Sequence, residues 1–204
     1  MSLVRLSLVG AFVVSATSAF CTISTTGPFS GALHESFDEF PDQGQELFLP
    51  NPTPSFGNHG IITTSGPFPA LAVYNPPDHP FGNYVAHDGD FFAVTQSTGD
   101  SFRIDMDQQM TDFGGWFGLD AIHVEFYDAS GASVGGGDYE TDFNVDGNLQ
   151  WLGWHSTVAF SSVDVSSQTS VIFDSLEADV VPEPVSVVAM GLGLAALLRK
   201  KWTH

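Results

Sequence analysis

The segment Asp142–Gly147 places oxygen-bearing side chains at alternate positions before a glycine. Ca²⁺ prefers several hard oxygen ligands, and oxygens at the first, third and fifth positions with glycine at the sixth begin a calcium loop of the EF-hand kind. Asp142, Asn144 and Asp146 are therefore the candidate metal ligands, and Ca²⁺ is the one cofactor that the sequence suggests. A plain hairpin is the favoured alternative, because Asp-Gly suits a two-residue type I′ turn and Gly153 stands where that loop needs Glu.

Two tryptophans follow this segment at a spacing that separates their roles. Trp151 and Trp154 are three positions apart, so in a regular strand they point to opposite faces of the sheet. One then fills the core, while the other lies at the surface, where the flat apolar face of an indole suits the C–H face of a sugar ring. Trp151 and Trp154 are therefore the candidate carbohydrate-binding residues, although core packing is the commoner role for either one alone.

No catalytic constellation is legible in the sequence. Gly131–Gly135 matches the G-x-S-x-G pattern of a nucleophile elbow, but Gly135-Gly136-Gly137 is a poor start for the helix that must follow, so we interpret the match as a glycine-rich turn. The histidines lack the spacing of a zinc site. We predict that the protein is not an enzyme. A secreted glycosidase-like enzyme, which needs two carboxylates facing a cleft, is kept as a second alternative.

The segments that would position these residues are strands. Alternation of apolar and polar residues at 101–106 and 122–127 predicts strands with one buried face, and it recurs near residues 158–160 and 171–173. Asp128-Ala129-Ser130-Gly131 is typical of a turn between strands. Residues 27–80 are rich in Pro, Gly, Asn and Ser, so we expect mostly loops there. Short strands are expected within that stretch at Leu33–Phe37, Ile61–Thr64 and Leu71–Tyr74.

No sustained helical period occurs between the two ends of the chain. Strands spaced about ten residues apart with one apolar face indicate an all-β fold, a two-sheet β-sandwich of jelly-roll-like form. The single Cys of the sequence cannot form an intramolecular disulfide, so the domain must depend on its core.

The charge of this central domain, residues 20–181, limits its partners. It holds all but one of the 24 acidic residues, whereas Arg103 is the only one of the 5 basic residues within it, which leaves 22 net negative charges with His neutral. Affinity for phosphate backbones comes from Lys and Arg, so binding to nucleic acid is excluded. Abundant Phe and Trp argue for a packed domain and against disorder.

The N-terminus predicts export. Arg5 precedes an apolar run, Leu6–Val14, and the small residues Ser15–Ala19 suit a signal peptidase, which predicts a signal peptide at 1–19. Near the C-terminus, Val185–Leu198 is apolar except for Ser186, and basic residues follow it. Extended to Trp202, this stretch reaches roughly 27 Å as a helix, close to the ~30 Å hydrocarbon core. Its basic end stays inside, so the domain lies outside.

Residues 182–204 resemble a PEP-CTERM sorting signal. The residues that carry the resemblance are Pro182, Glu183 and Pro184, the apolar helix after them, and Arg199, Lys200 and Lys201. The resemblance implies recognition and cleavage by an exosortase-type membrane protease, hence transient inner-membrane anchoring followed by transfer to the cell surface or the extracellular space. A tail of this kind is also known as an ice-binding protein C-terminal domain, a label that describes the tail and not the central domain.

Stretches such as Phe113–Phe117 and Phe173–Leu176 resemble the β-sandwich bodies of PEP-CTERM proteins, which are similar to lectins and carbohydrate-binding modules. This resemblance implies a second candidate cation site that pairs Asp38 with Asp174. The predicted function is that of an exported, non-enzymatic envelope or extracellular-matrix protein. The alternative is a calcium-assisted module that binds exopolysaccharide, either through a loop-rich end around Asn75–Asp90 or through the two tryptophans.

Overall fold

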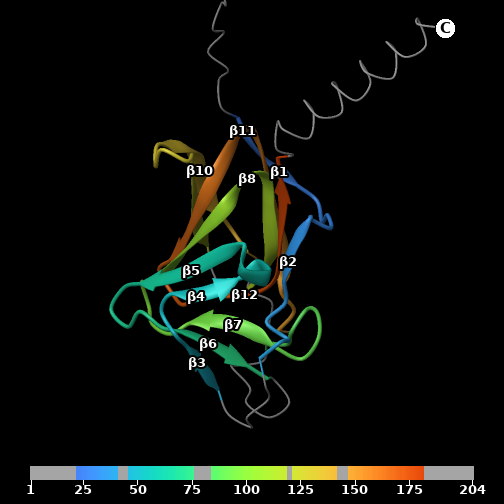
Figure 1. Ribbon diagram of the computed structural model, residues 1–204. Helices are drawn as coiled ribbons and strands as arrows, with labels where there is room; N and C mark the ends of the chain where they lie inside the picture. The colour runs from blue at the N-terminus through green and yellow to red at the C-terminus, as the bar shows by residue number, and fades with distance from the viewer. Residues whose placement is uncertain (1–21, 41–45, 76–83, 119–120, 142–146, 182–204) are drawn as a thin grey trace, which may run out of the picture.

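A computed structural model describes residues 22–40, 46–75, 84–118, 121–141 and 147–181. Within these ranges the chain forms twelve strands and one short 3₁₀ helix, η1 (Phe56–Asn58) (Figure 1). The strands are β1 (Ile23–Thr26), β2 (Leu33–Glu35), β3 (Leu47–Leu49), β4 (Thr53–Ser55), β5 (Gly60–Ser65), β6 (Leu71–Tyr74), β7 (Phe92–Thr95), β8 (Ser101–Gly118), β9 (Ile122–Tyr127), β10 (Ser133–Tyr139), β11 (Gln150–Ser167) and β12 (Ile172–Val180). The prediction of an all-β, sandwich-like domain is confirmed.

Two long strands, β8 and β11, run through both halves of the sandwich. The first half of β8 pairs with the second half of β11, as in Arg103 opposite Asp164, and the second half of β8 pairs with the first half of β11, as in Trp116 opposite Trp151. The register shifts between His155 and Ser162, where an irregular stretch bends the pair. The same two strands therefore supply residues to two different sheet faces.

Each half of the β8–β11 pair extends into its own layer. In one layer the order is β10-β9-β11-β8-β5-β4. In the other, β1 pairs with β11 and β12 pairs with β8, and β12 in turn carries β2 and the series β7-β6-β3. The side chains between the two layers form the core.

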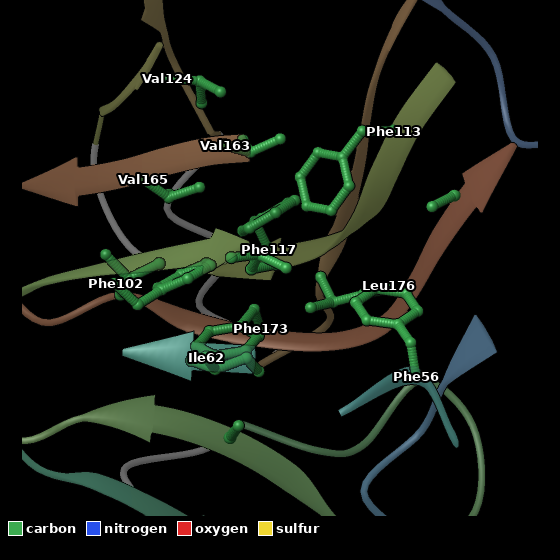
Figure 2. Packing of buried hydrophobic residues seen from close by; sticks show 14 of the residues in the cluster. Phe56, Ile62, Phe102, Phe113, Phe117, Val124, Val163, Val165, Phe173 and Leu176 are labelled. Atoms are coloured by element: carbon green, nitrogen blue, oxygen red, sulfur yellow. The ribbon is translucent and has the colours of Figure 1, made fainter. Parts of the chain in front are cut away.

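Aromatic rings fill the space between the layers. Phe102 stacks on Phe173 with ring centroids 4.3 Å apart (Figure 2). Phe117 meets Trp154 edge-on at 6.0 Å. Phe102 belongs to the alternating segment 101–106, so its apolar residues point inward and its polar residues point out. Burial of each such side chain contributes roughly 1.5–3 kcal/mol.

Most strands predicted from alternation are present, and the additions have physical reasons. The turn at Asp128 is confirmed: the Gly131 N–H donates to the Asp128 carbonyl at 2.9 Å, and Asp128 Oδ1 accepts the N–H of Ser130 at 2.8 Å. The glycine-rich segment expected to be a turn instead forms β10, paired with β9. Side-chain pattern gave no signal there, since three of its residues are glycines.

The predicted signal peptide (1–19) and sorting signal (182–204) lie outside the described residues. Among the residues that are described, no helix is long and apolar enough to cross a membrane.

Candidate functional site

The polar positions of four strands line up across the outer face of the β9-β11-β8-β5 sheet. The strand register places Thr63 beside Arg103, Arg103 beside Asp164, and Asp164 beside Glu125. A second row of side chains lies two residues away along each of these strands and follows the same register. It consists of Ser65, Ser101, Ser166 and His123. Together with Tyr127 these side chains line a hollow of about 580 Å³, which we call the sheet groove.

Arg103 is fixed at the centre of the groove. Its Nε donates to Asp105 Oδ1 at 2.8 Å, its Nη1 donates to Asp164 Oδ1 at 3.1 Å, and its guanidinium lies 4.9 Å from the centre of the Tyr127 ring. Asp105 Oδ1 also accepts the Ser162 hydroxyl at 2.7 Å. Partial desolvation lowers the pKa of Arg103, but its bonds to the two carboxylates outweigh this and raise that pKa. Arg103 therefore stays charged and held in place.

Tyr127 supplies the aromatic side chain of the groove. Desolvation, followed by the charge of Asp164 and a hydrogen bond with it, raises the pKa of the Tyr127 hydroxyl. The hydroxyl thus stays protonated at neutral pH. A protonated phenol beside a guanidinium and a carboxylate combines an apolar ring with hydrogen-bonding groups of both kinds.

A second hollow adjoins the first along β9 and β10. It has a volume of about 640 Å³ and shares His123 and Ser166 with the first hollow. His123 Nδ1 lies 2.8 Å from Asp138 Oδ1, and its Nε2 lies 3.8 Å from Glu125 Oε2. The two hollows therefore meet at His123 and Ser166, and together they extend the sheet groove toward the edge strand β10.

The two predicted carbohydrate-binding tryptophans lie in different environments. Trp154 is 1% exposed and packs among Phe113 and Phe126 in the core, so it offers no surface to a ligand. Trp151 is half-buried on the outer face of the other layer, where it contacts Phe29 edge-on at 5.5 Å. Its Nε1 donates to the Thr26 carbonyl at 3.2 Å. Of the two tryptophans, only Trp151 can therefore offer part of its ring to a sugar.

Two facing glycines make room for Trp151. A Cβ on Gly114 would lie 2.6 Å from the Trp151 ring, and a Cβ on Gly153 would lie 2.7 Å from its Nε1. The indole therefore rests directly on the backbone of β8 and β11. Any side chain at either glycine would displace it.

The predicted calcium ligands Asp142, Asn144 and Asp146 lie outside the described residues. In the described part of the chain, no group of three or more His, Cys, Asp or Glu side chains is arranged to hold a metal ion.

Asp38 and Asp174, the second candidate cation pair, both bind the segment 87–91 through its backbone. Asp174 Oδ2 accepts the N–H groups of His87 at 2.7 Å and Asp88 at 3.1 Å, and Asp38 Oδ1 accepts that of Asp90 at 3.0 Å. Burial raises the pKa of Asp174 to about 7, although the N–H donors act to lower it. The pair anchors this segment through hydrogen bonds.

Comparison with known proteins finds similarity in shape alone, and that similarity is weak. No protein-family model matches the sequence, and no curated protein matches it. Solved structures of similar shape include the module CsCBM6-3 from Clostridium stercorarium in complex with cellobiose, which is 12% identical, with coverage of 76% of this chain and 100% of that chain and a TM-score of 0.38. Another is a DUF4465 family protein from Bacteroides caccae, 12% identical, with coverage of 81% and 96% and a TM-score of 0.38.

A third similar structure comes from work on carbohydrate-binding modules of the β-sandwich superfamily; it is 8% identical, covers 75% of this chain and 64% of that chain, and has a TM-score of 0.33. The first and third of these neighbours are described as carbohydrate-binding modules. At such identities and TM-scores the likeness concerns architecture, and no ligand is inferred from it.

Sequence reasoning missed the sheet groove. Its lining was visible as the polar half of each alternating strand, at Ser101 and Arg103 in one and at His123, Glu125 and Tyr127 in another. The missing information was strand order, because alternation shows which residues point outward but not which strands are neighbours.

Proposed function

We propose that the protein binds a glycan chain in the sheet groove and that its role is non-enzymatic. The observation that carries this proposal is the pair of polar rows around Arg103 and Tyr127, set in an extended groove on an exposed sheet face. Sugars offer hydroxyl groups for hydrogen bonding and an apolar C–H face for contact with an aromatic ring, and this surface offers the complement of both.

Preorganisation supports the same proposal. Arg103, Asp105 and Asp164 are held to one another by hydrogen bonds before any ligand arrives. A ligand that meets side chains already in place loses less conformational entropy on binding, so a modest set of contacts gives useful affinity. The proposal rests on this chain's own groove and not on the ligands of similarly shaped proteins.

The proposal also includes the location of the protein, its cofactor and its partners. Residues 1–19 and 182–204 have the pattern of export and sorting signals, which would bring the domain to the cell surface or beyond, where polysaccharides lie. Ca²⁺, with Asp142, Asn144 and Asp146 as its ligands, is the cofactor included in this proposal. Exopolysaccharide, signal peptidase and an exosortase-type protease are accordingly the proposed partners.

The test is retention of the purified protein on a panel of immobilised polysaccharides, with calcium and with chelator. We expect Tyr127→Ala to reduce retention about tenfold, the loss of an aromatic contact and a hydrogen bond. Phe48→Ala is the matched control, because Phe48 is a 49% exposed aromatic on β3, away from the groove. Equal retention of Tyr127→Ala and wild type would contradict the proposal.

Trp151→Ala in the same assay tests the second surface. A loss of retention confined to Trp151→Ala would place the glycan on the opposite layer. If the wild-type protein is retained on no polysaccharide, the exported coat role suggested by the 22 net negative charges of residues 20–181 becomes the better account.

A further inference from the structure

Charge is distributed unevenly along the groove. Three carboxylates belong to its lining residues, Glu125, Asp138 and Asp164, against one guanidinium. A further carboxylate, that of Asp105, lies against the guanidinium from the side. With histidine neutral, the groove therefore carries a net negative charge of its own, within a domain that is itself strongly acidic.

The two basic side chains of the groove, Arg103 and His123, already have acidic partners. Arg103 donates to two carboxylates and lies against Tyr127, and its side chain is 34% exposed. His123 faces Asp138 through one ring nitrogen and Glu125 through the other. Among the described lining residues, both basic side chains therefore already face carboxylates, which weakens their attraction for an incoming carboxylate or sulfate.

An acceptor for a cation, by contrast, is available. The Asp138 side chain is 84% exposed, and its contact with His123 is made through Oδ1. Opposite charges within the Debye length of about 8 Å at physiological salt attract, and like charges repel. An ammonium group would find favourable contacts along this stretch, whereas an anionic sugar would enter a field of its own sign.

We infer that the groove discriminates among glycans by charge: it accepts chains of neutral sugars, prefers amino sugars with free ammonium groups, and rejects uronates and sulfated sugars. This inference rests on the proposed glycan-binding function and adds the class of glycan. It follows from the four carboxylates in and beside the groove and from Arg103, which is already bonded to two of them, and not from the overall acidity of the domain alone.

Calorimetric titration of the purified full-length protein tests the inference, with chelator present so that divalent cations cannot bridge two anions. The probes are oligosaccharides of glucosamine, glucose and galacturonate, matched in length and linkage as closely as available. At low salt we expect the glucosamine chain to bind about tenfold more tightly than the glucose chain, and the galacturonate chain about tenfold more weakly. High salt should reduce both differences in affinity, because it screens the charges.

Two exposed Asp–His pairs provide a matched comparison of variants. Asp138→Asn removes a charge beside His123 in the groove, and Asp107→Asn removes the same charge beside His59, where the Asp–His distance is 3.2 Å, outside it. We expect Asp138→Asn to weaken glucosamine binding roughly threefold more than it weakens glucose binding, since only the charged probe senses the lost negative charge. Asp107→Asn should change neither.

Two results would overturn the inference while leaving glycan binding intact. One is galacturonate binding as tight as glucose binding; the other is an equal effect of Asp107→Asn and Asp138→Asn, which would show that the charge of the whole domain acts and not that of the groove. If no probe binds at any salt concentration, the proposed function itself fails, and the inference fails with it.

Discussion

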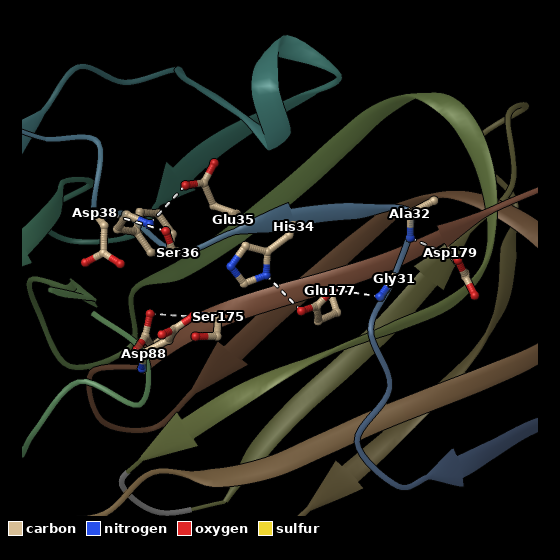
Figure 3. A network of polar contacts seen from close by, with 12 residues as sticks. Gly31, Ala32, His34, Glu35, Ser36, Asp38, Asp88, Ser175, Glu177 and Asp179 are labelled. Carbon is tan, nitrogen blue, oxygen red and sulfur yellow. Dashed lines mark hydrogen bonds and ion pairs between the residues drawn. The ribbon is translucent and has the colours of Figure 1, made fainter. Parts of the chain in front are cut away.

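The two outer faces of the sandwich use carboxylates in opposite ways. On the groove face, Asp105 and Asp164 pair with the side chain of Arg103 and leave the sheet open. On the other face, Glu177 Oε2 accepts the Gly31 N–H at 2.8 Å and Asp179 Oδ1 accepts the Ala32 N–H at 3.0 Å (Figure 3). A carboxylate that binds backbone holds a chain segment against the sheet, so that face is covered.

The difference between the two outer faces is already present within a single strand. The first half of β8 points Arg103 and Asp105 outward, whereas its second half presents Gly114 and Trp116 on the covered face. Long charged side chains keep solvent access, while glycines allow Trp151 and the segments beside it to lie close to the backbone. One bent strand pair thus builds a surface suited to ligands and another suited to anchoring loops.

The covered face should be the more sensitive to loss of a carboxylate. Asp174→Ala leaves the N–H groups of His87, Asp88 and Ser175 without their acceptor, so we expect a loss of about 3 kcal/mol in the free energy of unfolding. Asp164→Ala on the groove face is the comparison. Urea denaturation of both variants measures the difference, and equal losses would remove the distinction between the faces.

A pH series sharpens the comparison through Asp174 itself. Its pKa is about 7 in the folded protein, above the 3.8 of an unperturbed Asp, so the native state binds this proton more tightly than the unfolded chain. The resulting stabilisation is complete below about pH 4 and is lost as pH rises through 7, a swing of roughly 2–4 kcal/mol. Unfolding of wild type and Asp174→Asn between pH 4 and 8 should diverge accordingly; parallel curves would refute the assignment.

Substitution of a glycine that lies against the Trp151 indole should lower the stability by a smaller amount. Gly114→Ala places a Cβ 2.6 Å from the indole, so we expect a loss of about 2 kcal/mol from overpacking. Adding Trp151→Ala should recover part of it, because the clash disappears. A double-mutant cycle in urea measures this coupling, and simple additivity of the two changes would show that the indole does not rest on the glycine.

The groove face should show the smallest change in stability. Asp164→Ala removes one half-exposed partner of Arg103, and such pairs contribute about 1 kcal/mol or less. The same variant should still weaken glycan retention, because it removes a hydrogen-bonding group from the groove. A large loss of stability with unchanged retention would make Asp164 a structural residue.

The sequence could predict the local features of this fold better than its assembly. Alternation located the strands that hold Phe102 and Val124, and the spacing of Trp151 and Trp154 separated a core residue from a half-exposed one. Both inferences depend only on the two-residue period of a strand. The edge strand β10 escaped prediction because its glycines carry no side-chain pattern.

Strand alternation could not predict which distant strands would pair with one another. The groove joins Thr63 to Glu125 through two intervening strands, and nothing in the sequence around either residue specifies these neighbours. Asp38 and Asp174 were paired by resemblance, and they do bind one common segment, but as acceptors of backbone N–H groups. Their local sequences give the residue types and leave the partners open.

Mapping the glycan on the protein tests the central claim most directly. In an amide NMR titration of the purified protein with a bound oligosaccharide, we predict that the shifts concentrate at Arg103, Glu125, Tyr127 and Ser166, while the indole N–H of Trp151 does not move. Shifts confined to Trp151 and the segment 87–91, with the groove amides unchanged, would contradict the account and move the binding site to the covered face.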